Sequence, residues 1–319
     1  MRDFPLAAAV RTAAAILSLV VASAPLHAQS TPAQTTPAPN SQPAPNSREA
    51  REAEQRAAWQ AAAAVATRGP ADVTLLDQAV LKLPARYVFV PKAEAMRIMR
   101  SLGNTISEKS FVGIVVSAGA DPWIVVVRHI QEGYIKDDDA KNWNQDELLK
   151  NLKEGTDAAN EDRRSRGFTE LEVVGWVEPP AYDAQTHRLV WSLSLKPKGE
   201  TGAQVNGINY NTYALGRDGY FSLNLLTDSG HIGRDKAVAH ELLADLDYNA
   251  GKRYEDFNAS TDHIAEYGLA ALIGGIAAKK LGLFAVIIAF ALKFAKVIAV
   301  GAVALGAGVM KFFRRKPAA

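Results

Sequence analysis

The chain has no cysteine among its 319 residues. This absence excludes disulfide bonds, thiolate zinc sites and cysteine nucleophiles, and it leaves the redox compartment undetermined. An excess of charge of one sign is also absent, because 36 lysines and arginines are balanced by 34 acidic residues and the formal net charge is +2. Since nucleic-acid binding needs a basic face interleaved with aromatic residues, we expect no nucleic-acid partner.

Motifs that would name a reaction are lacking too. His240-Glu241 needs a second histidine four positions after the first to form the zinc-binding HExxH pattern, but that position is Ala244. The three aspartates at 137–139 lack the alternating ligands and mid-loop glycine of a calcium-binding loop. No GxSxG elbow or glycine-rich phosphate loop follows a predicted strand. We therefore expect no metal, no cofactor and no catalytic residue.

The N-terminus has the pattern of a secretory signal peptide. Two arginines accompany an apolar run at 12–24, and Ala28 provides a small residue at the expected cleavage point. The run is shorter than the roughly 20 residues that a helix needs to cross a bilayer, so a signal peptide at 1–28 is the preferred prediction. Residues 29–47 are almost wholly Pro, Ala, Thr, Ser, Gln and Asn, which predicts a flexible tether.

The C-terminal part is the most apolar segment of the chain. We expect a membrane-proximal helix at 263–280, a single transmembrane anchor at 281–310 and a basic cytoplasmic tail at 311–319. The alternative, a helical hairpin, would leave Lys279 and Lys280 near the centre of its first helix and the basic tail outside. The lipid bilayer is thus the first expected partner, and the bacterial inner membrane with a periplasmic domain is the expected location.

Small and charged residues share one stripe of this C-terminal segment. Such a stripe is suited to helix packing, so it predicts contact with a second copy of the chain or with another membrane protein. The residues are Gly275, Gly282, Lys293 and Lys296.

Between the two ends, residues 71–262 predict one α+β domain. Strong helix formers of mixed charge predict a helix at 48–70 before it, with a solvated stalk as one interpretation. Because short turns join successive strands, the sheet must be largely antiparallel. Strands are expected at 86–90, 111–116, 123–130, 170–177, 187–195, 208–215 and 220–226, and helices at 92–102, 144–166 and 234–250.

Aromatic, proline and ionisable residues gather between the strands at 170–177 and 187–195. One interpretation is a binding groove, and the alternative is a rigid connection whose aromatic rings complete the core. The candidate groove residues are Trp176, Tyr182, Asp183, His187 and Trp191.

Three blocks occur in the order GWVEPPAYDAQTHRLVW, NYNTYALGRDGYFSLNLL and GKRYEDFNASTDHIAEYGLAALIGG. With these blocks the chain, from about residue 71 to its C-terminus, resembles domain-of-unknown-function family 2167. The resemblance implies an exported bacterial protein anchored at its C-terminus. It implies no activity, cofactor or catalytic residue.

Three hypotheses about function follow. The first is a non-enzymatic envelope module that binds or senses an envelope component, and it requires a concave patch near Trp176 and Tyr182. The second is an envelope hydrolase in segments 176–191 and 216–241, which requires hydrogen-bond contact between at least two residues of the set Asp183, His187, Asp218 and His240. The third is a structural subunit of a membrane complex.

Overall fold

The computed structural model describes residues 48–102, 104, 108–141, 143–165, 169–201 and 205–274. The expected signal peptide, tether, transmembrane anchor and basic tail lie outside these residues, and so does the stripe of Gly275, Gly282, Lys293 and Lys296. Among the helices within the described ranges, none combines the length and the apolar character that a membrane span requires.

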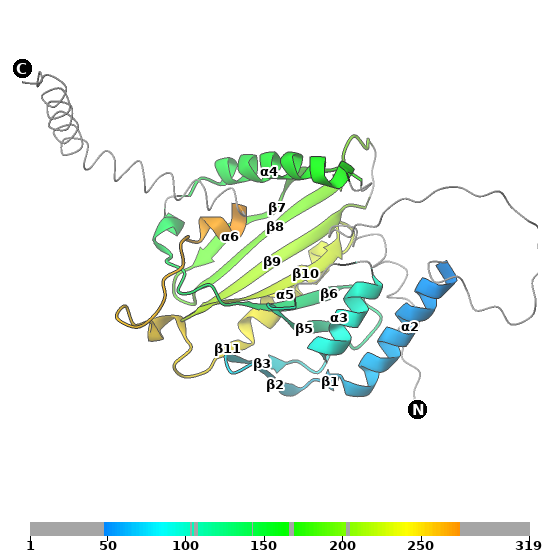
Figure 1. Ribbon diagram of the computed structural model, residues 1–319, viewed down its shortest axis with the longest axis horizontal. Coiled ribbons are helices and arrows are strands. Elements are labelled where there is room, and N and C mark those ends of the chain that lie inside the picture. The colour runs from blue at the N-terminus through cyan, green and yellow to red at the C-terminus, as the bar shows by residue number, and fades with distance from the viewer. Residues whose placement is uncertain are drawn as a thin grey trace, which may run out of the picture.

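An antiparallel sheet of eight strands organises the fold (Figure 1). The strands are β1 (Thr67–Arg68), β4 (Tyr87–Pro91), β5 (Phe111–Ser117), β6 (Ile124–Ile130), β7 (Leu171–Asp183), β8 (Arg188–Pro197), β9 (Gly207–Gly216) and β10 (Gly219–Asp228). Their order across the sheet is β1-β4-β5-β6-β10-β9-β8-β7. Every neighbouring pair is antiparallel, which confirms the predicted α+β class with its antiparallel sheet.

A second, three-stranded sheet has the order β11-β3-β2. It consists of β2 (Ala71–Leu75), β3 (Ala79–Leu83) and β11 (Leu246–Tyr248). The sequence did not predict this sheet. The helix expected at 234–250 is α5 (Ile232–Ala244), and the residues after it pair with β3 instead of continuing the helix. A pairing partner about 165 residues away in sequence thus outweighs local helix propensity.

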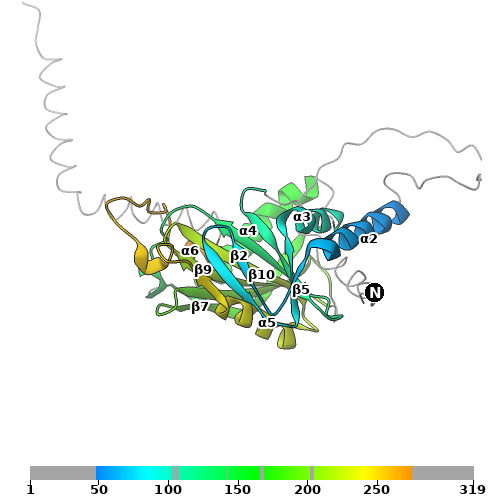
Figure 2. The same cartoon turned by 90° about the horizontal axis from the view of Figure 1, so that it is seen from below.

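Helices cover both faces of the large sheet (Figures 1 and 2). On one side lie α2 (Arg48–Val65), α3 (Lys92–Ser101), α4 (Gln145–Ser165) and α6 (Ala270–Gly274), and on the other side lies α5. We call the first side the α4 face and the second the α5 face. Two short 3-10 turns, Asp138–Lys141 and Tyr254–Asp256, complete the described elements.

The hydrophobic core differs between these faces. On the α5 face one continuous cluster joins the large sheet, the small sheet and α5, with Phe221, Leu223 and Leu225 of β10 fully buried in it. On the α4 face the core is divided into two clusters. One lies under α2 and α3 around Ile98 and Phe111, and the other lies under α4 and α6.

The two flanking helices belong to the domain. In α2 the side chains of Ala58 and Ala62 are fully buried in the cluster shared with α3, so this helix packs on the domain and is no solvated stalk. At the other end, the helix expected from residue 263 begins at Ala270. Leu269 and Ile273 are buried beneath it, so the core of the domain continues beyond residue 262.

Candidate functional site

The segment proposed as a groove between two strands is itself part of a strand. β7 continues through Pro179 and Pro180 to Asp183, with register shifts against β8 between Trp176 and Ala181. Because β7 is the last strand of the sheet, prolines are tolerated there without loss of a ladder bond on the outer side.

The predicted groove residues separate into three groups. Trp176 and Trp191 form an edge-to-face pair with ring centroids 6.2 Å apart. The Tyr182 hydroxyl donates to Asp137 Oδ2 (2.8 Å) and lies 3.0 Å from His187 Nδ1. Asp183 accepts hydrogen bonds from neighbours in its own hairpin turn.

Both ring groups pack into the cluster under α4 and α6. His187 stacks on Tyr254 with centroids 4.0 Å apart, and burial together with the Asp137 carboxylate raises the pKa of Tyr182. These contacts agree with the alternative interpretation, in which the rings complete the core.

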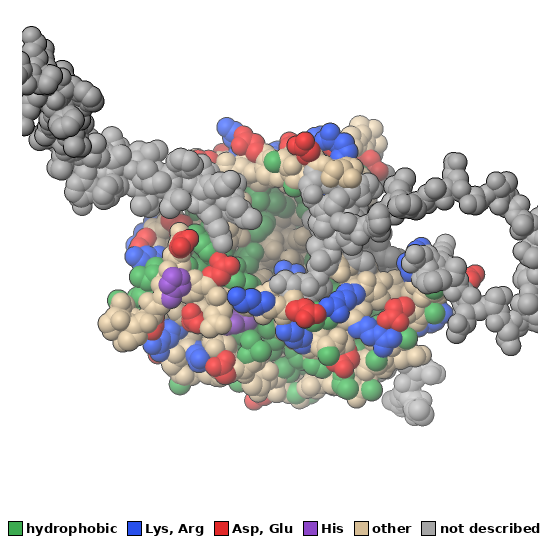
Figure 3. Space-filling model, in the orientation of Figure 1, with side chains coloured by type: hydrophobic (Ala, Val, Ile, Leu, Met, Phe, Trp, Pro, Cys, Tyr) green, Lys and Arg blue, Asp and Glu red, His purple; other side chains and the backbone are tan. Residues whose placement is uncertain are grey.

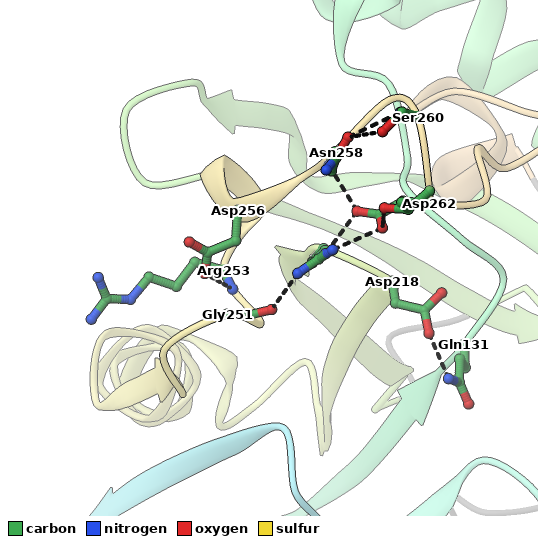
Figure 4. A network of polar contacts seen from close by, with 10 residues as sticks. Gln131, Asp218, Gly251, Arg253, Asp256, Asn258, Ser260 and Asp262 are labelled. Atoms are coloured by element: carbon green, nitrogen blue, oxygen red, sulfur yellow. Dashed lines mark hydrogen bonds and ion pairs between the residues drawn. The ribbon is translucent and has the colours of Figure 1, made fainter.

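The residues proposed for a hydrolase are not brought together. His240 Nε2 lies 2.7 Å from the Tyr210 hydroxyl, and Asp218 accepts a hydrogen bond from Gln131 (Figure 4). Within the described part of the chain, no hydrogen bond or ion pair joins two members of the set Asp183, His187, Asp218 and His240. The structural requirement of the hydrolase hypothesis is therefore not met.

A row of polar side chains on the α4 face extends from between its two apolar clusters into the cluster under α4 and α6. Arg128 of β6 lies opposite Ser222 of β10, which lies opposite Tyr213 of β9. In the next row Asn224 lies opposite Asn211. Facing side chains on neighbouring strands are about 5 Å apart, so these residues form one patch. We call it the polar strip, with the members Arg128, Ser222, Asn224, Asn211, Tyr213 and Trp191, the last opposite Asn211.

Several groups in the polar strip lack partners. The Asn224 Oδ1 atom is buried and makes no hydrogen bond to another part of the protein, and the buried Trp191 Nε1 lies beside the Tyr213 hydroxyl without a hydrogen bond of good geometry. Burial lowers the pKa of the Arg128 guanidinium, and the rings near it are Tyr213 and Tyr220. Among the described residues, no acidic side chain forms an ion pair with Arg128.

The surface of the α4 face is hollowed. Figure 3 shows the α4 face with a depression between α4 and the elements below it, and hydrophobic side chains are visible inside the depression. Charged side chains lie along its borders. The polar strip lies at the centre of the sheet on this face, between the areas covered by α3 and by α4.

A second concavity of about 550 Å³ lies beside α5. Its charged groups are already paired, since Arg86 contacts Glu241 and Arg234 contacts Asp235 at 2.9 Å and Asp121 at 3.4 Å. Because these pairs satisfy each other, this pocket gives a weaker reason than the polar strip to expect a ligand.

Residues 251–269, here called the strap, hold α6 against the α4 face. Asp262 is the centre of its polar network (Figure 4), and Arg217 donates to both Asp262 oxygens at 2.7 and 2.8 Å. These bonds from Arg217 keep the pKa of Asp262 well below its usual value.

The end of the strap is fixed by Asp139. Its carboxylate accepts the backbone N–H groups of Leu269 and Ala270 at 3.1 and 3.0 Å. A Cβ atom at position 268 would lie 2.5 Å from an oxygen of Asp139, so only Gly268 permits this approach. The aspartate run at 137–139 thus has structural roles, and no cluster suited to a metal ion occurs in the described ranges.

Of the members of the polar strip, the sequence pattern indicated Trp191 and missed the other five. A usable signal exists in β10, where Ser222 and Asn224 alternate with Phe221, Leu223 and Leu225. This alternation marks one wetter face of one strand, but it does not reveal that Arg128 lies opposite.

Comparison with known proteins gives one family. A model of the family described as "Protein of unknown function (DUF2167)" matches residues 67–306. The comparison with curated proteins gave no match. Among solved structures, the chain is similar to the solution structure of cyanobacterial PsbP (CyanoP) from Synechocystis sp. PCC 6803. The identity is 11%, the coverage is 54% of this chain and 88% of that chain, and the TM-score is 0.33, which is too low to carry an argument.

Proposed function

The chain belongs to the DUF2167 family, and from this premise we propose that it is a membrane-anchored extracytoplasmic protein that binds an envelope component at the polar strip. The apolar segment at 281–306 lies inside the region that the family model matches, so the predicted anchor is part of the same unit as the domain.

The observation that carries the proposal is the buried amide oxygen of Asn224, which has no hydrogen-bond partner in the polar strip of an otherwise apolar sheet face. A buried polar atom without a hydrogen-bond partner costs about 1–3 kcal/mol. Asn224 Oδ1 is such an atom. A bound ligand that supplies partners removes this cost, which is why the polar strip supports a binding function.

The composition of the polar strip favours binding over catalysis. General acid–base catalysis needs a group that exchanges a proton near neutral pH, usually a histidine or a carboxylate. The polar strip contains arginine, serine, asparagine, tyrosine and tryptophan, and the nearby His129 points to the opposite face, where it contacts Phe221. Ser222 therefore has no base within the polar strip to activate it.

The proposed anchor keeps the domain close to the bilayer. Six residues separate Gly274, the last residue of α6, from residue 281, where the predicted span begins. A chain of that length reaches at most about 20–25 Å. The α6 side of the domain is thus held near the membrane surface, where lipids and membrane proteins are the available partners.

The binding function is tested by identifying what the protein carries. We expect the full-length protein, extracted from its native membranes in mild detergent, to retain a small molecule detectable by native mass spectrometry. Asn224→Leu fills the polar strip and should lose that molecule, whereas Gln185→Leu, in the exposed β7–β8 turn, should retain it. A wild-type protein with nothing bound, or identical species on both variants, contradicts the proposal.

The topology has its own test. With a single span, alkaline phosphatase fused after Ala319 is inactive and a fluorescent protein that folds only in the cytoplasm is bright. The reverse pattern excludes the single span in favour of the helical hairpin.

A further inference from the structure

The one formally charged member of the polar strip points to the chemistry of the ligand. Resting on the proposed function, we infer that the ligand carries an oxyanion, a phosphate or carboxylate group, which binds the guanidinium of Arg128.

The surroundings of Arg128 leave its charge uncompensated. Its neighbour across β5 is Phe111, which is 1% exposed, and its neighbour across β10 is Ser222. Val126 precedes it on the same face of β6. A charge removed from water toward apolar side chains is costly unless an opposite charge accompanies it.

Other arginines of the domain have a carboxylate that balances their charge. Six of them lie within ion-pair distance of a carboxylate of the protein itself: Arg86, Arg97, Arg100, Arg164, Arg217 and Arg234. Arg128 differs because, in the described part of the chain, the groups that face it are the phenols of Tyr213 and Tyr220. An anion from outside the chain is the missing counterpart.

The groups next to Arg128 are mostly hydrogen-bond donors. The guanidinium offers five N–H donors in a planar fork that matches a phosphate or a carboxylate. The Ser222 hydroxyl opposite Arg128 and the amide of Asn224, two residues further along β10, can both donate. A group with several acceptor oxygens satisfies more of these donors than a neutral or cationic ligand does.

The same oxyanion chemistry has two sources, a free anion or the headgroup of a lipid. Both are tested with the full-length protein in a neutral maltoside detergent, by thermal unfolding at constant ionic strength. The probes are inorganic phosphate, succinate and dihexanoyl phosphatidic acid, and dihexanoyl phosphatidylcholine is the control with the same acyl chains and no net charge.

We expect at least one of the three anions to raise the unfolding temperature of the wild-type protein, and the phosphatidylcholine to have no effect. The apparent affinity should fall about tenfold or more in Arg128→Gln, because charge-assisted bonds are lost. Arg128→Lys keeps the charge without the fork and should be intermediate. Arg97→Gln, an exposed arginine paired with Glu54, should bind like the wild type.

The pattern of responses decides between the sources and between the two proposals. A response to phosphatidic acid alone indicates a lipid headgroup, and a response to phosphate or succinate indicates a free anion. Equal affinities in wild type and Arg128→Gln, or no response to any anion, overturn the inference. If Asn224→Leu still loses its bound molecule in that case, the binding function stands and only the anionic chemistry is wrong.

Discussion

The two faces of the eight-stranded sheet differ in whether buried polar side chains have hydrogen-bond partners. On the α5 face, the Thr212 hydroxyl donates to the Leu223 carbonyl (2.8 Å) and the Ser192 hydroxyl donates to the Asn209 carbonyl (2.9 Å). On the α4 face, Asn224 Oδ1 is equally buried but has no partner. The same strands build both faces, and the binding function that we propose for the α4 face accounts for the difference.

The largest expected effect comes from the α5 face. Phe221 is fully buried in the continuous cluster, so Phe221→Ala should lower the free energy of unfolding by about 3–5 kcal/mol. Its neighbour in sequence faces the polar strip, and Ser222→Ala should change stability by less than about 1 kcal/mol. Urea unfolding of the full-length protein, followed by circular dichroism, measures both. Losses of similar size would contradict the proposed division between the faces.

A change of opposite sign is expected on the α4 face. Asn224→Leu replaces a buried, unpaired amide oxygen with apolar atoms, so it should leave stability unchanged or raise it by about 1 kcal/mol in the ligand-free protein. The same urea experiment measures it. Asn209→Leu, in β9 opposite Leu226, gives the comparison at a second position on this face. A clear loss of stability in Asn224→Leu would mean that its amide has a structural partner.

The strap that closes one end of the α4 face should be sensitive to acid. The pKa of Asp262 is lowered by Arg217 from an ordinary value of 3.8, so its carboxylate stabilises the folded state above that value. This contribution is lost as the pH falls from about 4 toward the lowered pKa. Asp262→Asn should therefore destabilise the protein at pH 7 by a small amount, and the difference from the wild type should shrink below pH 4. Thermal unfolding at several pH values measures it, and a difference that stays constant with pH would exclude the ion pair as its cause.

The smallest effect concerns the α5 face near neutral pH. Burial lowers the pKa of His129 from its ordinary value of 6.5, so the neutral form is favoured when the protein is folded. Below pH 6.5 the unfolded chain binds the proton more readily, and stability falls with decreasing pH by less than about 1.4 kcal/mol per pH unit. His129→Gln should flatten this dependence between pH 7 and 5. An unchanged slope would show that other groups cause it.

Much of the fold follows from local pattern. The alternation within β8 and β10 and the short turn at Gly216–Gly219 are enough to predict strands and an antiparallel pair. By contrast, the pairing of Leu246 with Leu81 joins segments far apart in sequence, so β11 has no local signal strong enough to oppose the preceding helix.

The candidate site was harder to predict for the same reason. Trp176, Tyr182, His187 and Trp191 attracted attention because they are close in sequence. The rings of Trp176, Tyr182 and Trp191 pack in the cluster under α4 and α6, and Trp191 is also a member of the polar strip. Arg128 and Asn224 come from strands almost a hundred residues apart, and only the register of β6 with β10 brings them to one face. Alternation shows which residues share a face within a strand, but the sequence does not state which strands are neighbours.

The two edge strands of the large sheet limit the pairing of this sheet with sheets of other molecules. One border strand, β1, is two residues long, and the other, β7, carries two adjacent prolines and three register shifts. Short or proline-interrupted borders offer an incoming strand few consecutive N–H donors, so they oppose the joining of sheets from different molecules. A protein tethered to a membrane is confined to a thin layer, where its local concentration is high. With the proposed anchor, copies of this domain can collect in that layer without adding to one another's sheets.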